Sequence, residues 1–102
     1  MEQSEKAVVL NARDNVATAL VNLSAGAIVR LDIVGKIVTV RLTGNVPFGH
    51  KFSLSKVEPG ESIIKYGEVI GTACSAIGPG DYVHVHNVAS TRGRSTAKGG
   101  VK

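Results

Sequence analysis

The sequence predicts an all-β domain with little helix, and three features of the chain support this prediction. Hydrophobic residues make up 43% of the 102 positions, and most of them are aliphatic, with many of the β-branched residues that favour strands. Apolar and polar residues alternate on either side of Gly35 in residues 29–42, as in strands that have one face in water. A glycine spacing typical of chain reversals recurs, whereas helix is suggested only by a short turn at residues 51–56.

The first part of the chain is expected to hold two short strands separated by a turn. Residues 1–6 are polar and should be frayed. Residues 7–10 form a short strand, and residues 11–15 contain enough turn formers to reverse the chain. Residues 16–21 fit either a buried strand or a short piece of helix. We favour the strand because the segment is short and apolar residues alternate there with small ones.

A hairpin and a weak internal repeat organise the middle of the chain. The hairpin runs through residues 29–42 and turns at Gly35. The repeat is an apolar residue, two others, glycine, two others and an apolar residue, and it occurs at Leu23-Gly26-Val29, Val57-Gly60-Ile63 and Ile77-Gly80-Val83. Glycine supplies the positive φ of a tight turn, so each copy should turn the chain into a new strand. The unequal distances between copies argue against a solenoid.

The charge distribution argues against nucleic-acid binding. The formal net charge is +4, but all of this excess lies in residues 92–102, and residues 1–91 carry no net charge. A body without a basic face, with only 4% aromatic residues, is a poor candidate for recognising nucleic acid. We therefore expect one domain at residues 7–91 and a flexible basic tail at residues 92–102.

The chain carries no sign of a secreted or membrane protein. Its single cysteine, Cys74, cannot form an internal disulfide and lies among small residues, which favours a half-buried filler over a reactive thiol. No apolar run approaches the roughly 18 residues of a membrane helix, and the N-terminus has no signal-like core. We expect a cytoplasmic protein with no membrane partner.

The residues with chemical potential lie between Pro47 and Asn87. His84 and His86 should share one face of a strand, because side chains two positions apart do so. They are candidate catalytic groups and candidate ligands of a metal ion whose third ligand comes from elsewhere. The alternative is a pair of solvent-facing histidines at a strand end. The candidate substrate-binding residues are His50, Lys51, Lys65, Tyr66 and Asn87.

Two lysines are candidate anchors for a substrate carboxylate. Lys51 is expected to be exposed at the end of a turn, where solvation is the alternative to function. Lys65 follows two isoleucines and precedes the Tyr66-Gly67 corner, a costly place for a charge that has no use. No phosphate loop, nucleophile elbow or carboxylate dyad accompanies them. The isolated chain should thus be inactive, and a chain of this length should share its site with a partner.

An ordered set of short motifs resembles a known family. The set is Asp14-Asn15-Val16-Ala17, Gly49-His50-Lys51, Ile64-Lys65-Tyr66-Gly67, Ile70-Gly71, Gly80 and His84-Val85-His86-Asn87. Together they resemble the small SAF-type domain of the altronate and galactarate dehydratase family, over residues 7–91. The resemblance implies a compact β-clip fold. Cys74 and the basic tail depart from the expected pattern, and the tail leaves the mode of partner binding open.

The resemblance also implies a reaction and a partner. In that family the domain is either the N-terminal part of a long sugar-acid dehydratase or a separate small subunit, and a similar subunit occurs in sulfolactate sulfo-lyase. The chain stops where the large domain would begin, so it resembles the separate-subunit form. The implied enzyme is an iron-dependent lyase acting on a hydroxy acid. Its Fe²⁺ would be held mainly by the large catalytic subunit, and the motif residues above would line the shared active site.

Three functions remain open at this point. Dehydration of an altronate- or galactarate-type sugar acid comes first, and loss of sulfite from sulfolactate is the alternative within the same class. A non-catalytic SAF module that binds carbohydrate is the alternative from another class. Association of the chain with a second copy of itself also stays open.

Overall fold

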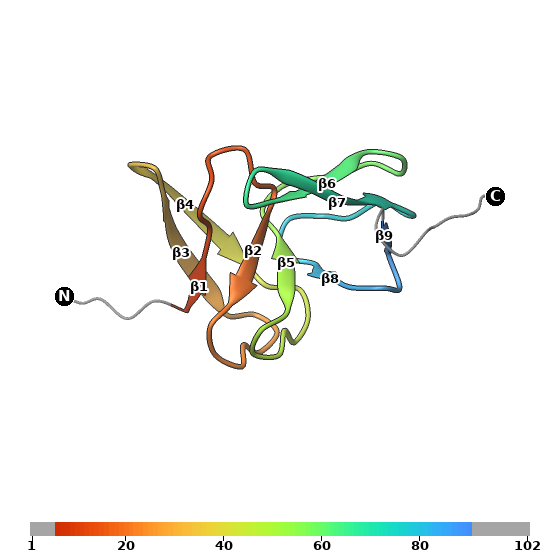
Figure 1. The fold of residues 1–102 in the computed structure, drawn as a ribbon. Coiled ribbons are helices and arrows are strands. Elements are labelled where there is room, and N and C mark those ends of the chain that lie inside the picture. The colour runs from red at the N-terminus through yellow and green to blue at the C-terminus, as the bar shows by residue number, and fades with distance from the viewer. Residues whose placement is uncertain (1–5, 91–102) are drawn as a thin grey trace.

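Nine strands and no helix make up the part of the chain, residues 6–90, that the computed structural model describes (Figure 1). In chain order they are β1 (Ala7–Val8), β2 (Val16–Ala19), β3 (Ile28–Ile33), β4 (Lys36–Arg41), β5 (Lys51–Ser53), β6 (Ser62–Lys65), β7 (Glu68–Ala73), β8 (Tyr82–Val83) and β9 (Val88–Ser90). The predicted all-β fold is confirmed. The helical turn expected at residues 51–56 is wrong, because β5 begins there, and residues 16–21 hold the favoured strand.

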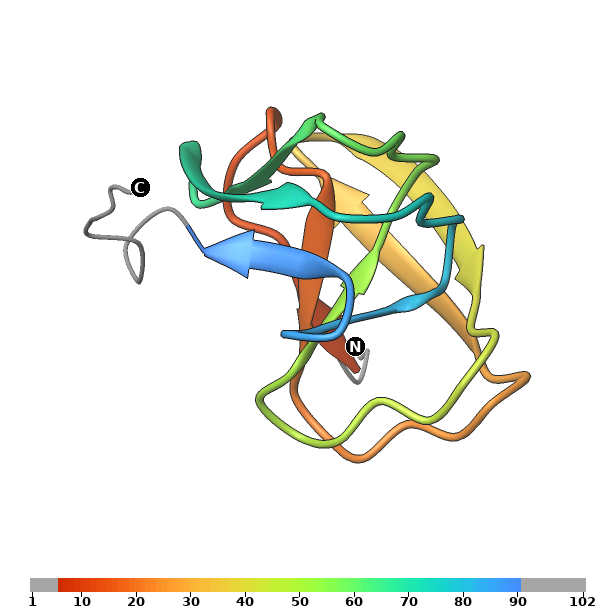
Figure 2. The same cartoon turned by 90° about the vertical axis from the view of Figure 1, so that its right-hand side faces the viewer.

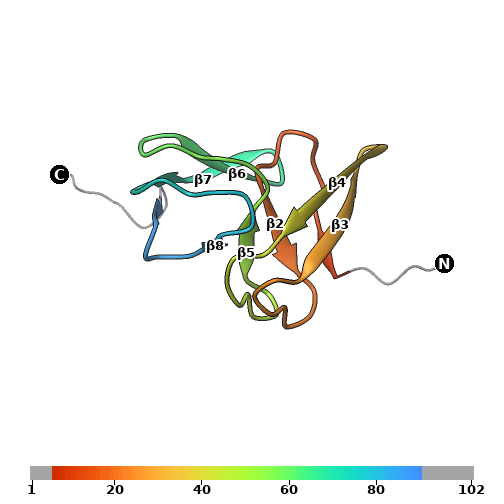
Figure 3. The same ribbon diagram turned by 180° about the vertical axis from the view of Figure 1, so that it is seen from behind.

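The strands form three antiparallel sheets. One has the order β1-β2-β5-β8, the second is the β3-β4 hairpin, and the third has the order β6-β7-β9. Figures 1 and 3 show the two hairpins on opposite sides of the central strands β2 and β5. Figure 2 shows β9 running beside β7, at the C-terminal end of the described chain.

Four equivalent glycine turns connect these strands, one more than the sequence pattern indicated. The fourth copy is Val46-Gly49-Phe52, which has the same spacing as the other three. The four glycines have φ values of 84° to 90°, and in each turn the residue after the glycine donates its N–H to the carbonyl three positions earlier. Isolated bridges join the turns in two pairs, at Leu23–Val46 and at Val57–Ile77. The chain is therefore built as two related halves.

Each half contains one hairpin with a two-residue tip. The predicted hairpin through Gly35 is confirmed, and its tip has positive φ at Val34 (52°) and Gly35 (85°). The tip between β6 and β7 has the same form, with φ of 56° at Tyr66 and 79° at Gly67. Two consecutive positive φ values define the type I′ turn, whose twist matches that of the flanking strands. The first tip position suits Asn or Gly better than Val or Tyr.

The core is aliphatic, as the composition predicts, and it has two parts. The cluster under β3 and β4 includes Ala17 and Phe52, and the cluster under β6 and β7 includes Val16 and Ile63. Successive residues of β2 therefore face different clusters, as alternation along a strand requires. A strand buried on both faces reads as an almost continuous apolar run, which explains why residues 16–21 were ambiguous in sequence.

Two expectations fall outside the described residues. The basic tail at residues 92–102 is one, and most of the frayed N-terminus at residues 1–6 is the other. Within residues 6–90, no helix is long and apolar enough to cross a membrane.

Candidate functional site

The segment that carries the two neighbouring histidines is a turn. β8 ends at Val83, and His84 accepts hydrogen bonds at its carbonyl from the N–H groups of Asn87 (3.0 Å) and Val88 (3.1 Å). The prediction that His84 and His86 extend a strand is therefore wrong. The alternation that suggested a strand is too short, at three residues, to be distinguished from a turn.

Asn87 holds this turn in shape. Its side-chain oxygen accepts the N–H of His84 at 2.9 Å, and its side-chain nitrogen donates to the carbonyl of Tyr82 at 2.8 Å. The residue is only 7% exposed, so its amide is committed to the main chain. A direct contact of Asn87 with substrate stays a prediction, while the positioning of His84 is what the geometry shows.

Tyr82 connects the histidines, and the sequence patterns did not single it out. Its hydroxyl lies 2.6 Å from Nδ1 of His50. Its ring is stacked on that of His84, with centroids 5.4 Å apart and planes within 8°, and it lies 5.7 Å from the ring of His86. His50 and His84 are themselves 5.1 Å apart between centroids. The structure thus gathers all three histidines around one tyrosine, which is one of only two tyrosines in the chain.

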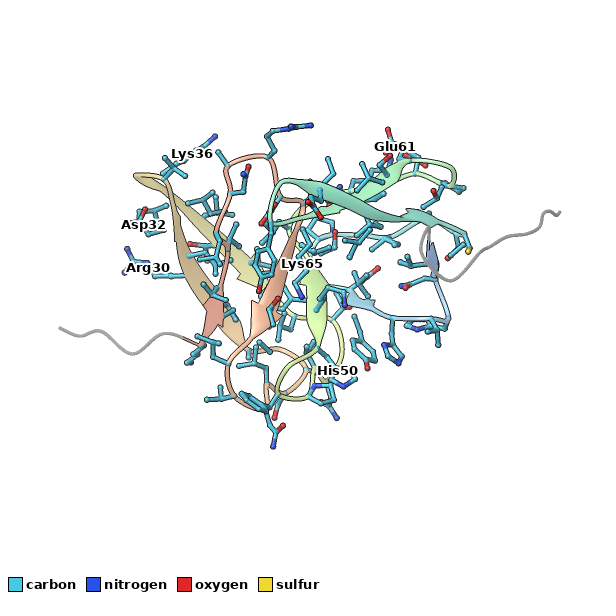
Figure 4. All side chains as sticks on the ribbon, in the orientation of Figure 1. Arg30, Asp32, Lys36, His50, Glu61 and Lys65 are labelled. Atoms are coloured by element: carbon cyan, nitrogen blue, oxygen red, sulfur yellow. The ribbon has the colours of Figure 1, made fainter. Side chains whose placement is uncertain are left out.

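A pocket of about 440 Å³ opens beside this cluster. Four of the predicted site residues line it, namely Lys51, Lys65, Tyr66 and His84, together with Glu68 and the apolar side chains of Ile70, Val83, Val85 and Val88. The pairing of β5 with β8, which places Lys51 opposite Val83, brings the lysine to the histidine segment. His50, His86 and Asn87 do not line the pocket. Figure 4 shows Lys65 near the centre of the molecule and His50 below it, toward the loops that follow β2 and precede β5.

Two lysines and the carboxylate of Glu68 line the pocket, so its lining carries one net positive charge. Lys51 is half-buried, and burial lowers the pKa of its ammonium below the usual 10.5, with a further lowering from the charge of Lys65. The Lys65 ammonium lies 4.8 Å from the centre of the Tyr66 ring, a cation–π distance. An anion bound near the two lysines would offset the cost of burying the Lys51 ammonium and the repulsion from Lys65. Carboxylate, sulfonate and phosphate groups are therefore the ligands that the pocket suits.

The loop before β2 positions the hairpin that carries Lys65. The carboxylate of Asp14 accepts the N–H of Gly67 at 2.8 Å, and Asp14 is 8% exposed. The side chain of Asn15 donates to the carbonyl of Ser62 at 2.9 Å and accepts the N–H of Ile64 at 2.8 Å. In the sequence these residues were only turn formers and part of a motif. Their long-range contacts show that they brace β6 and its tip.

The described residues do not form a complete metal site. Within residues 6–90, no group of three or more His, Cys, Asp or Glu side chains could hold a metal ion. The residues present thus do not fit an iron centre on their own. A metal bound by His84 and His86 would need further ligands from outside the described residues, and this role stays a prediction.

Comparison with known proteins adds the family. Residues 5–91 match the model of the altronate/galactarate dehydratase SAF domain. The chain is 44% identical to altronate dehydratase of Escherichia coli (strain K12) and 36% identical to that of Bacillus subtilis (strain 168), each over 78 residues, or 76% of this chain and 15% of the relative. It is 39% identical to (2R)-sulfolactate sulfo-lyase subunit alpha of Paracoccus pantotrophus over 54 residues, or 51% of this chain and 81% of the relative.

These relatives differ greatly in how much of their length the chain covers. It spans 15% of the altronate dehydratases but most of the sulfo-lyase subunit. The match of the family model to residues 5–91 takes in every described element and every candidate site residue. The predicted resemblance is confirmed, and the chain belongs to the SAF-domain family of the altronate and galactarate dehydratases.

Proposed function

We propose that this chain is the small subunit of a two-subunit carbon–oxygen lyase that removes water from an altronate- or galactarate-type sugar acid. It supplies part of an active site that a large subunit completes. The observation that carries the proposal is the pocket in which Lys51, Lys65 and His84 meet. Family membership restricts the chemistry of such a pocket, since relatives named as dehydratases and as a sulfo-lyase are both lyases.

The two lysines suit the step that is difficult in this reaction. Removing a proton from the carbon beside a carboxylate moves negative charge onto that carboxylate, and cations placed there stabilise the transition state more than the ground state. His84 lies in the same pocket and is the candidate to take this proton or to protonate the leaving hydroxide. His86 contacts the same Tyr82 ring from outside the pocket and is the second candidate.

The iron that the family implies belongs mainly to the large subunit in this proposal. The supporting observation is that the described residues lack a group of three metal-ligating side chains. The small subunit then binds and orients the hydroxy acid through Lys51, Lys65 and Tyr66.

A sulfolactate sulfo-lyase is the alternative within the same class. The supporting observation is that the alpha subunit of Paracoccus pantotrophus is matched over 81% of its length by about half of this chain, so most of a separate subunit corresponds to part of this domain. Sulfite would leave in place of hydroxide, and a lysine pair suits a sulfonate as well as a carboxylate.

Reconstitution tests the proposal and separates the alternatives. The chain is co-purified with a candidate large chain, and the complex is assayed for a dehydrated keto acid from altronate or galactarate and for sulfite from sulfolactate. We expect turnover only from the complex, lost or strongly reduced by Lys65→Ala but not by Lys36→Ala, since Lys36 lies on the other hairpin (Figure 4). Turnover by the small chain alone would contradict the subunit role. A monomer that binds sugar acids and recruits no large chain would favour the binding module instead.

A further inference from the structure

The hydrogen bond between Tyr82 and His50 determines what His50 can do. The two atoms are 2.6 Å apart, both side chains are half-buried, and the rings lie 5.7 Å apart between centroids. Nδ1 of His50 is therefore occupied. Within residues 6–90, Nε2 of His50 has no hydrogen-bond partner, and the Tyr82 hydroxyl has none besides His50.

Two arrangements of the shared proton are conceivable, and the chemistry of the two groups distinguishes them. Either the phenol donates to an unprotonated Nδ1, or a protonated Nδ1 donates to the phenol oxygen. A phenol is a much stronger acid than a neutral imidazole N–H and is thus the better donor. In the second arrangement the phenolic hydrogen would also lack an acceptor among the described residues. In the first arrangement the hydrogen on Nε2 of His50 lacks one as well, so the greater acidity of the phenol decides between the two.

We infer that Tyr82 is a positioning residue that fixes neutral His50 as the tautomer with hydrogen on Nε2. His50 is then a hydrogen-bond donor through Nε2, beside the pocket-lining His84, and this donor is available to an acceptor oxygen of the bound acid. It is not the general base, because its one lone pair is held by the phenol. For the same reason it is not a metal ligand. This inference narrows the roles of acid, base or ligand that the sequence left open for His50.

The inference assigns different roles to His50 and His84. Donation from Nε2 of His50 suits a carboxylate or hydroxyl oxygen, where a hydrogen bond helps to hold developing negative charge. The acid–base role then falls to His84, whose ring lies 5.1 Å from that of His50 and which lines the pocket. Stacking of Tyr82 on His84 lets one tyrosine orient both imidazoles, through its hydroxyl for one and through its ring face for the other.

NMR of the whole 102-residue chain tests the tautomer without any activity. Long-range proton–nitrogen correlation spectra are recorded about two pH units above 6.5, the ordinary pKa of histidine. The His50 signals are assigned as those that disappear in His50→Gln. We expect Nδ1 of His50 to be unprotonated and Nε2 to be protonated. Tyr82→Phe, which keeps the ring, should shift the Nδ1 signal toward that of a free lone pair. Tyr66→Phe is the matched control and should leave both His50 signals in place.

Protonated Nδ1 in the wild-type chain would overturn the inference, as would unchanged His50 signals in Tyr82→Phe. If Tyr82→Phe fails to fold, the protonation of Nδ1 and Nε2 in the wild-type chain still tests the inference.

The kinetic arm rests on the proposed function and uses the reconstituted complex. Gln can donate from its amide but cannot act as a base at neutral pH, so His50→Gln should retain kcat/KM within about tenfold, whereas His50→Ala should lose about ten- to a hundredfold. Tyr82→Phe should lower kcat/KM in the wild-type background and add little to His50→Ala. Equal losses in His50→Gln and His50→Ala would overturn the donor role. A complex without lyase activity would refute the proposed function and leave the NMR result standing.

Discussion

Replacing Lys51 by Met should weaken substrate binding and at the same time stabilise the chain. Lys51 is half-buried, and its pKa is lowered by burial first and by Lys65 second, so its charge opposes folding at neutral pH. Met keeps much of the aliphatic stem and removes the charge. A charge-assisted hydrogen bond contributes about 1.5 to 3 kcal/mol to binding, so its loss should raise KM for the hydroxy acid about ten- to a hundredfold.

The gain in stability should be small, because Lys51 is only partly buried. Screening limits it to less than about 1 kcal/mol, which corresponds to a rise in thermal midpoint of a few degrees at most in a domain of about this size. The measurements are steady-state kinetics of the reconstituted complex and thermal unfolding of the small chain. Lys36→Met, at an exposed position on β4, is the control and should change neither quantity. An unchanged KM, or a clear fall in midpoint, would refute this account of Lys51.

Three further predictions follow from the same geometry. The pKa of Lys51 lies below 10.5 in the folded chain, so between the folded-state and unfolded-state pKa values the unfolded chain binds more protons, and the free energy of unfolding should rise with pH through that window. Affinity for a carboxylate, measured by titration, should fall over the same window as Lys51 loses its proton. Asn tolerates a positive φ better than Tyr or Val, so Tyr66→Asn and Val34→Asn should each relieve backbone strain at a hairpin tip and stabilise the chain by about 1 kcal/mol. Only Tyr66→Asn should weaken substrate binding. A loss of stability in both variants would refute the strain argument. Asp14→Ala should leave the Gly67 N–H unpaired, lower stability by about 1 to 3 kcal/mol and raise KM; a change in unfolding without a change in KM would show that the brace is structural only.

The fold was predictable from the sequence where local chemistry determined it. Alternation around Gly35 and the glycine spacing are short-range signals, and both correspond to elements of the structure. The missed copy, Val46-Gly49-Phe52, overlaps the Gly49-His50-Lys51 motif, which was interpreted as part of the site instead of as part of a repeat. The suggestion of a short helical turn at residues 51–56 was wrong because β5 pairs with β2 on one side and β8 on the other. These hydrogen bonds outweigh the weak local preference of a short segment.

The site was predictable in its residues but not in its arrangement. Lys51, Lys65, Tyr66 and His84 line one pocket, although they come from three segments that only the pairing of strands brings together. Tyr82 was missed because it lies on a two-residue strand, where its only signal is to precede His84 by two positions. The part played by Asp14 and Asn15 could not be read from spacing, because their partners are about fifty residues away.

Comparing the two hairpins of the internal repeat shows which contacts the fold requires and which serve the site. Both hairpins have the same tip, and in both a carboxylate accepts the N–H of the tip glycine. In the first hairpin the acceptor is Asp32, three residues before Gly35, so that tip is capped locally. In the second, Asp32 is matched in position by Ile64, and the acceptor is Asp14, from the loop before β2. A local cap would satisfy the fold in both cases.

The long-range cap adds a fixed position for the tip relative to the rest of the domain. That position matters only in the second hairpin, which carries Lys65 and Tyr66 into the pocket. Asp32→Ala is therefore the matched control for Asp14→Ala: both remove a carboxylate that caps a tip glycine, and both should cost stability. Only the loss of Asp14 should let the second tip move and so reduce the affinity for a hydroxy acid. Equal effects of the two substitutions on affinity would mean that the brace and the pocket are unconnected.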